Sequence, residues 1–496
     1  MTPCNLTPLG LLLVVATTAA AAPLEELPNV VVIFTDDQGW GDVGCFGAEG
    51  FVTPNLDRMA AEGTRFTNFY VSAAVCSASR SSLLTGCYNQ RLGITGAFGP
   101  DSRKGLHTDE VTFAELAKSR GYATAMFGKW HLGDEPELLP TNQGFDEYYG
   151  LPYSHDMWPL HPNQRTTPTG SGANYPPLPS IEQDAVADAE IDEAEAANLT
   201  TAYTERAVDF VDRHADSPFL LYLAHSMPHV PLYVSEKFAS SQPGGLYGDV
   251  IREIDWSVGQ VLDAIDRNGL AESTLVLFCS DNGPWLAYGD HAGSAGPFRE
   301  GKGTTFEGGV RTPMIARMPG QVPAGRVCET PAMTIDVFPT IARLLGAEMP
   351  AHPIDGTDLW PLLTGHPQAG ATHEAFYFFW HGRLEAVRVD NWKLHYPHRY
   401  RSLTVAGENG QPGKYEQLTI EKSLFDLSSD EGETTNVLDD HPDVVARIDR
   451  LAAVMRQRLG DGRTGETGSE VRPLGMAATD TVAGQAAPRG TKKGDN

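Results

Sequence analysis

The sequence predicts an α/β protein in which helices sandwich a large, mixed and mostly parallel sheet, with a smaller antiparallel sheet and one helix toward the C-terminus. Three short apolar runs indicate the large sheet, at 29–34, 219–224 and 274–279. Runs that are apolar at nearly every position are typical of parallel strands buried on both faces. Helical patterns alternate with them, at 55–62, 112–120, 201–213 and 244–267. This alternation favours helices on both sides of the sheet.

The C-terminal part of the chain has a different pattern. Residues 374–379, 384–389 and 392–396 have the pattern of successive strands, and Asp390-Asn391 forms a tight turn between the last two. A helical pattern follows at 442–459. We therefore expect a main domain over 27–372, with a surface insertion at 159–198, and a C-terminal subdomain over 373–460. Residues 461–496 are rich in Gly, Thr and Ala and are expected to form a flexible tail.

The first residues indicate export. Residues 9–22 form an apolar tract that is too short to span a bilayer. The tract fits a signal peptide over 1–22, so we expect a periplasmic or secreted protein, or a lysosomal or other secretory-pathway protein in a eukaryote. No later segment offers about 20 uninterrupted apolar residues, so stable membrane insertion is not expected. Asn198-Leu199-Thr200 is a glycosylation sequon whose use the sequence leaves open.

The charge balance and the cysteine content limit the classes of partner and site to be considered. The chain has 37 Lys and Arg against 64 Asp and Glu, a net charge of −27. This balance argues against a nucleic-acid or anionic-membrane partner, and an anionic substrate would need a local cluster of positive groups. Of the six cysteines, Cys4 lies in the predicted signal peptide, which leaves an odd number. There is no CxxC pair, and any disulfide pairing is left open.

Two pairs of oxygen ligands follow buried strands. Asp36-Asp37 comes after the first apolar run, and Asp281-Asn282 after the third. Either pair alone is compatible with a solvated loop. Because the carboxyl ends of parallel strands meet at one edge of the sheet, the two pairs together predict a site for a hard divalent cation, Ca²⁺ or Mg²⁺.

A cysteine and several positive groups add an anion site. Cys76 begins a helix-like run, CSASRSSLLTG at 76–86, and Arg80 lies one turn later on the same side. A helix N-terminus favours an anion, so Cys76 is either an activated thiol or an ordinary buried cysteine. Further positive groups are Lys129, His131, His225, His229 and Lys302. Each alone is ordinarily structural or solvated, and their convergence with the oxygen ligands is what predicts a site.

These motifs resemble those of the type I sulfatases, the formylglycine-dependent enzymes. The run at 76–86 is similar to the family's signature, and GYATAMFGKWH at 121–131 to its second signature. Further segments that resemble family motifs occur in the family's order along the chain: Asp36-Asp37, 280–283, 301–302 with 307–311, and 424–436. The motif GLPYSHD at 150–156 is similar to the arylsulfatase A branch. The resemblance covers about 29–440 and implies an alkaline-phosphatase-like fold.

The resemblance implies a sulfuric ester hydrolase that cleaves sulfate monoesters of aryl, sugar or lipid alcohols and releases inorganic sulfate. It implies that Cys76 is converted to formylglycine by a maturation enzyme and reacts as a geminal diol. It implies one Ca²⁺ per chain, held by Asp36, Asp37, Asp281, Asn282 and the modified residue 76. The other implied roles are diol binding by Arg80 and Lys129, a base at His131, and sulfate binding and leaving-group protonation by His229 and Lys302. Lys129 is also implied to bind the substrate, and Ser154 to donate a hydrogen bond to sulfate.

Two alternatives remain at this point. One is a phosphomonoester or phosphonate hydrolase of the same superfamily, although its alkaline phosphatases use Ser or Thr and two zinc ions. The other is a sulfated-glycan binding protein with a degenerate site, which would lack Cys76, Lys129 or Asp281; all three are present. Ala78 stands where the family's signature commonly has Pro, which leaves open which maturation enzyme accepts the segment. The natural substrate and the oligomeric state are also open.

Overall fold

The computed structural model describes residues 27–100, 102–159, 175–240 and 243–477. An eleven-stranded sheet runs in the order β11-β2-β10-β9-β1-β8-β4-β5-β6-β7, with β12 beside β2. Its centre is parallel, from β9 through β1, β8 and β4 to β5, and β10 is antiparallel to both of its neighbours. The central strands are β1 (Asn29–Thr35), β4 (Ala123–Lys129), β5 (Glu147–Leu151), β8 (Phe219–Ala224) and β9 (Thr274–Ser280). The outer strands are β2 (Thr64–Tyr70), β6 (Ser180–Glu182), β7 (Ala185–Asp188), β10 (Arg311–Arg317), β11 (Arg326–Cys328) and β12 (Ala332–Met333).

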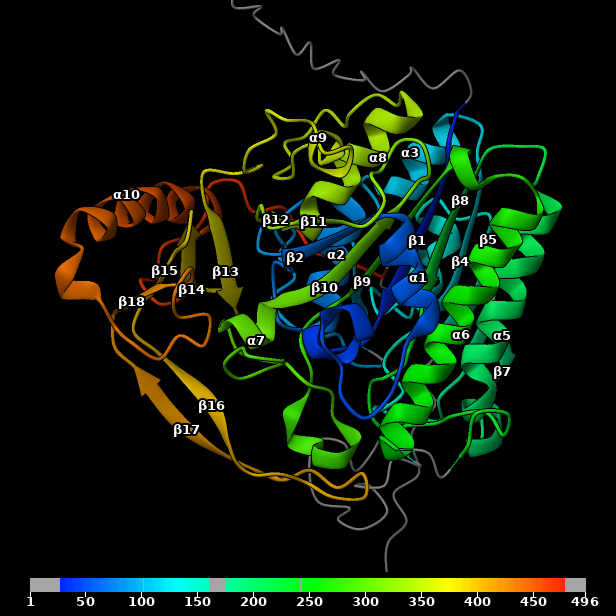
Figure 1. Cartoon of the computed structure of the whole chain (residues 1–496), viewed down its shortest axis with the longest axis horizontal. Helices are drawn as coiled ribbons and strands as arrows, with labels where there is room; N and C mark the ends of the chain where they lie inside the picture. Colours follow the sequence, from blue (N-terminus) through cyan, green and yellow to red (C-terminus); the bar gives the residue numbers. More distant parts are fainter. Residues whose placement is uncertain (1–26, 101, 160–174, 241–242, 478–496) are drawn as a thin grey trace, which may run out of the picture.

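Helices cover both faces of this sheet (Figure 1). On β1, Val30 and Val32 pack in the core that contains α2, α3 and α8, whereas Val31 and Ile33 pack in the core that contains α1, α5 and α6. Both faces of the strand are therefore apolar, as its sequence predicts. The helices are α1 (Pro54–Glu62), α2 (Cys76–Thr85), α3 (Phe113–Ser119), α5 (Glu193–Arg213), α6 (Gly245–Arg267) and α8 (Val337–Leu345). The predicted fold class is confirmed.

The C-terminal part forms a four-stranded antiparallel sheet in the order β13-β14-β15-β18, with α10 packed on it (Figure 1). Asp390 has a positive φ of 54° in the predicted turn. The sequence reading missed β18 and the β16–β17 hairpin. The elements are β13 (Phe376–Trp380), β14 (Arg383–Val389), β15 (Trp392–His395), β16 (His398–Val405), β17 (Lys414–Ile420), β18 (Ser423–Asp426) and α10 (Pro442–Leu459).

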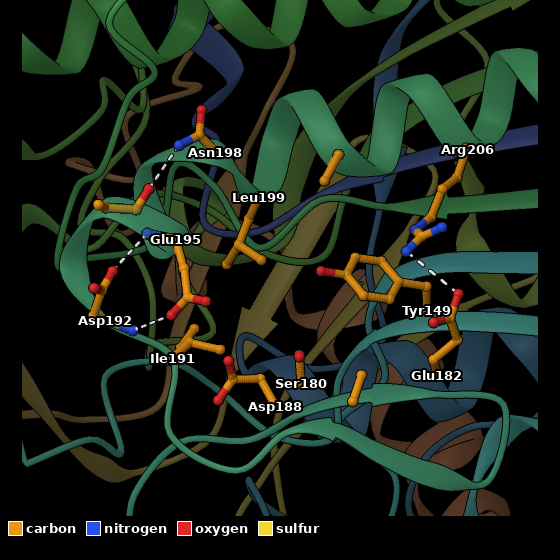
Figure 2. Close-up of a pocket in the computed structure, with 13 residues that line it drawn as sticks. Tyr149, Ser180, Glu182, Asp188, Ile191, Asp192, Glu195, Asn198, Leu199 and Arg206 are labelled. Atoms are coloured by element: carbon orange, nitrogen blue, oxygen red, sulfur yellow. Dashed lines mark hydrogen bonds and ion pairs between the residues drawn. The ribbon is translucent and has the colours of Figure 1, made fainter.

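The predicted insertion at 159–198 contains regular secondary structure in its second half. Residues 160–174 lie outside the described residues, but β6 and β7 extend the main sheet and α5 begins at Glu193. Asp192 and Glu195, both exposed, form a capping box: the Glu195 amide donates to Asp192 at 2.8 Å, and the Asp192 amide donates to Glu195 at 2.7 Å. Figure 2 shows these bonds beside a cavity of about 580 Å³, which none of the predicted site residues lines.

The predicted flexible tail is ordered over its first part. Gly475–Met476 (β19) pairs with Lys104–Gly105 (β3), and Arg472 donates to both carboxylate oxygens of Glu110 at 2.6 and 2.7 Å. Polar contacts of this kind do not show in the composition, from which the flexible tail was predicted. Residues 478–496 and the predicted signal peptide lie outside the described residues. No helix in the described ranges has the length and apolar character that crossing a membrane requires.

A buried ionic network joins the two sheets. Lys393 of β15 donates to Glu307 of α7 (Glu307–Val310) at 2.9 Å and lies 3.2 Å from Glu433, which also accepts a bond from the Glu307 amide at 2.7 Å. All three side chains are fully buried. Because the two carboxylates share one lysine, the contact between the sheets depends on that charge.

We expect Lys393→Met to lower the free energy of unfolding by about 3–5 kcal/mol, because it removes the cation that two buried carboxylates share. Among the ion pairs of the described residues, Glu307 would keep only the longer contact with Arg311 at 3.4 Å, and Glu433 the contact with His395 at 2.7 Å. Urea unfolding measures this free energy. The matched control is Lys422→Met, which removes a lysine paired with Asp449 at the surface and should cost about 1 kcal/mol or less. Equal effects of the two substitutions would contradict the role given to the network.

Candidate active site

The four predicted oxygen ligands meet where β1 and β9 end. The two strands are parallel neighbours in register, with Thr35 opposite Ser280, so the residues that follow them lie side by side. The Asp37 amide donates to Asp281 Oδ1 at 3.1 Å, and Asn282 Nδ2 donates to Asp37 Oδ1 at 2.6 Å. Asp37 has a φ of 64°, a left-handed conformation that is sparsely populated outside glycine and is often found at functional sites.

The donor atoms fit a hard divalent cation. Asp36 Oδ1 and Asn282 Oδ1 are buried and have no hydrogen-bond partner among the described residues. One ligand atom from each of Asp36, Asp37, Cys76 and His229 lies within 4.8 Å of the others. Burial, together with the charge of Asp36, raises the pKa of Asp281 to about 7. A bound cation would relieve this crowding of carboxylates and would take up the unpartnered oxygens.

Three buried cations surround these carboxylates. Arg80 of α2 donates to Asp281 Oδ2 through Nη2 at 2.8 Å and to the Lys129 carbonyl at 3.1 Å. Lys129, at the end of β4, contacts Asp36 and donates to Ser154 Oγ at 3.0 Å. Lys302 lies 2.8 Å from Asp37 Oδ1. Burial by itself would raise the pKa of Asp36, but Lys129, His229 and Arg80 hold it well below its ordinary value. Three cations balance three carboxylates, so a bound divalent cation would give the site a net positive charge for an anionic substrate.

Cys76 is the first residue of α2 and is 2% exposed. Its Sγ lies 3.5 Å from Lys302 Nζ. Burial raises the pKa of the thiol although Lys129 and Lys302 oppose the shift. An unmodified thiol here is therefore protonated and a weak nucleophile, which argues against the activated-thiol reading.

The remaining predicted residues line a cavity of about 180 Å³ beside Cys76, namely His131, Ser154, His229 and Lys302. His131 Nε2 donates to the Phe98 carbonyl at 2.8 Å, and its Nδ1 has no partner among the described residues. His229 Nδ1 donates to the Val230 carbonyl at 2.6 Å, which leaves Nε2 3.5 Å from Asp37. His225 does not line this cavity. Its Nε2 lies 3.2 Å from Ser257 Oγ, and burial lowers its pKa to about 3.

Sequence reasoning missed several residues of the same cavity. Asp156, Met157, Trp285, Trp380 and Arg401 also line it. Asp156 lies in the GLPYSHD motif, and its place after Ser154 was the one available signal. Trp380 and Arg401 come from the C-terminal part, whose position against the main sheet cannot be read from local patterns.

Comparisons with known proteins agree with this geometry. A family model described as Sulfatase matches residues 28–347, and one described as the C-terminal region of aryl-sulfatase matches 371–473. Human arylsulfatase A is 39% identical over 435 residues, which covers 85% of each chain. The crystal structure of the PsFucS1 sulfatase from Pseudoalteromonas sp. has a TM-score of 0.77 at 28% identity, over 87% of this chain and 90% of that one.

The phosphonate monoester hydrolase of Agrobacterium radiobacter is more distant, at 21% identity and a TM-score of 0.58 over 87% of this chain and 96% of that one. That likeness shows a shared fold alone. Membership of the sulfatase family implies a formylglycine and a divalent metal in the active site. The two family models and the match to arylsulfatase A show that the chain belongs to the sulfatase family, in its arylsulfatase A-like branch, and is an enzyme that hydrolyses sulfate monoesters.

Proposed function

We propose that residue 76, as hydrated formylglycine, is the nucleophile of this sulfatase, and that one Ca²⁺ is held by Asp36, Asp37, Asp281, Asn282 and residue 76. The observation that carries the proposal is the position of Cys76: it starts a buried helix, contacts Lys302 and shares a cluster with Asp36 and Asp37. With residue 76 modified, the proposed ligands offer oxygen atoms, which suits Ca²⁺. The bound cation would lower the pKa of the attacking hydroxyl and offset negative charge on the substrate.

The protein's own cations and bases have separate tasks in this proposal. Arg80 and Lys129 orient the modified residue 76 and stabilise charge that develops on it. Burial and the neighbouring Lys129 keep the pKa of His131 well below its ordinary value, so its ring is neutral and its free Nδ1 can accept a proton. His229 and Lys302 bind sulfate and protonate the departing oxygen, and Ser154 donates a hydrogen bond to sulfate.

Mass spectrometry of the peptide that contains residue 76 tests the nucleophile directly. The expected result is the mass of an aldehyde or its hydrate in place of the thiol, together with release of inorganic sulfate from 4-nitrophenyl sulfate. Sulfate release by a protein whose Cys76 is wholly unmodified would overturn the proposal. The same measurement shows whether the maturation enzyme of the expression host accepts a signature with Ala78.

We expect Asp281→Ala to remove the metal and to lower kcat by about 10²–10³-fold, because it deletes one proposed ligand and the partner of Arg80. Elemental analysis and sulfate release, with and without added Ca²⁺ after chelation, measure both effects. The control is Asp184→Ala, which removes an exposed carboxylate beside β7. Two zinc ions per chain in the native protein would instead favour the phosphatase alternative.

Export and substrate range complete the proposal. The predicted signal peptide at 1–22 would direct the chain to an exported compartment, and its removal is tested by N-terminal sequencing of the mature protein. Aryl, sugar and lipid sulfates all present the sulfate monoester that the cavity beside Cys76 is proposed to bind.

A further inference from the structure

The cavity of about 580 Å³ at the edge of the main sheet belongs to no step of the proposed reaction (Figure 2). It lies between the outer strands β5, β6 and β7 on one side and the N-terminal part of α5 on the other. None of the residues assigned to the nucleophile, the metal or the sulfate lines it. A volume of this size is typical of sites for small molecules.

The strand register places four side chains of this edge on one face. Tyr149 of β5 is opposite Glu182 of β6, and Ser180 of β6 is opposite Asp188 of β7. Residues two apart on a strand share a face, and directly opposite residues have Cβ atoms about 4.5–5.5 Å apart. The Tyr149 ring lies 6.0 Å from the ring of Tyr203 on α5. The four side chains therefore face α5 across the cavity.

Three of the groups on this face have hydrogen-bonding capacity to spare. Ser180 is 3% exposed, and its hydroxyl points into the cavity without a partner among the described residues (Figure 2). The Tyr149 hydroxyl is likewise unpartnered there. Asp188 Oδ1 accepts from the Glu190 amide at 2.9 Å, which leaves its second oxygen free. A buried polar group without a partner is costly, so a group from solvent or a ligand is expected at Ser180.

The nitrogen donors of the cavity are already engaged. Arg206 lies 3.3 Å from Glu182 and 3.9 Å from the centre of the Tyr149 ring. Asn198 Nδ2 donates to the Ala194 carbonyl at 2.7 Å. The free groups are therefore one carboxylate oxygen and two hydroxyls, all of which can accept a hydrogen bond.

The charge of the lining points to a cation. Four carboxylates and one guanidinium line the cavity, so negative charge is in excess. Asp192 already caps the N-terminus of α5, so this end of the helix is not a vacant anion site. An ammonium group donates three hydrogen bonds and accepts none, which matches three free acceptors. Ile191 and Leu199 add an apolar wall for the carbon part of a ligand.

We infer that this cavity binds a small protonated amine. Asp188, Ser180 and Tyr149 accept hydrogen bonds from its ammonium group, and its apolar body packs against Ile191 and Leu199. A sulfated ligand is excluded by the negative lining, and an uncharged one would leave the charge of Asp188 unpaired. The inference is independent of the proposed function, because the two cavities share no lining residue.

The test measures binding of cyclohexylamine to the full-length protein at neutral pH by calorimetry and by ligand-detected NMR. Cyclohexanol and cyclohexanecarboxylate serve as the uncharged and anionic analogues of similar shape. We expect cyclohexylamine to bind with a Kd of about 1 mM, on the order expected for a ligand of its size. Cyclohexanol should bind at least about 10-fold more weakly, because it lacks the charge-assisted hydrogen bond. The carboxylate should not bind.

Variants locate the bound amine. Asp188→Asn should weaken cyclohexylamine binding by about 10- to 100-fold, the range for a hydrogen bond between charged groups. Ser180→Ala and Tyr149→Phe each remove one hydroxyl and should weaken it about 3- to 10-fold. The matched control is Asp184→Asn, which makes the same charge change at an exposed residue between β6 and β7 that does not line the cavity. It should bind the amine as the wild type does.

Equal weakening in Asp184→Asn and Asp188→Asn would overturn the inference, because the amine would then respond to net charge alone. Cyclohexanol binding as tight as that of cyclohexylamine would overturn it as well, since the cavity would then select shape and not charge. Unchanged amine binding in Asp188→Asn, Ser180→Ala and Tyr149→Phe would place the amine elsewhere on the protein.

Discussion

In the Cys76→Ser variant we expect multiple-turnover sulfate release to fall by about 10⁴-fold or more, the scale for loss of a covalent nucleophile. Serine cannot be converted to the hydrated aldehyde by the same oxidation of a thiol. A serine hydroxyl that accepted sulfate would form a stable ester, since no second hydroxyl on the same carbon is present to expel it. Steady-state assays and intact mass spectrometry after incubation with substrate measure the two consequences.

The matched control for this variant is Cys328→Ser, which makes the same atomic change at a buried cysteine of β11. Cys328 does not line the cavity beside residue 76, so its replacement should leave turnover near the wild-type value. Cys76→Ala should lose activity as well, but without any sulfated protein. Full multiple turnover in Cys76→Ser would rule out the proposed nucleophile.

The oxygen-ligand cluster could be predicted because it depends on local rules. Buried parallel strands are recognisable from continuous apolar runs, and residues that follow neighbouring strands must meet at one edge. The register of β1 against β9 therefore brings Asp37 to Asp281. The sequence could not show that Asp37 would adopt a left-handed backbone, which lets two successive carboxylates share one site.

Local patterns are least informative where long-range contacts decide the structure. The tail looked loose because it has few apolar residues, and it is held by strand pairing and by Arg472. Trp380 reaches the active-site cavity only because the second sheet docks beside the first, a contact with no local sequence signal.

The proposed division of tasks among the cations predicts different responses to the leaving group. Replacing Lys302 or His229 with Ala should slow alkyl and sugar sulfates more than nitrophenyl sulfates. A poor leaving group needs its oxygen protonated as the S–O bond breaks, whereas a nitrophenolate needs little help. Loss of general-acid assistance is typically worth about 10²–10⁴-fold, so a plot of log kcat/KM against leaving-group pKa should become steeper in both variants.

Lys129→Ala is the matched control for this slope. It removes another buried lysine of the same cluster, but one that is proposed to act on the nucleophile at residue 76 and not on the leaving group. Lys129 contacts Asp36 and Ser154, whereas Lys302 contacts Asp37 and Cys76 and lies against Trp285. Its loss should slow all substrates by a similar factor, so the slope should stay at the wild-type value. If Lys302→Ala and His229→Ala also shift every substrate equally, the two residues bind sulfate without protonating the leaving group. The departing oxygen would then take its proton from another group at the cavity.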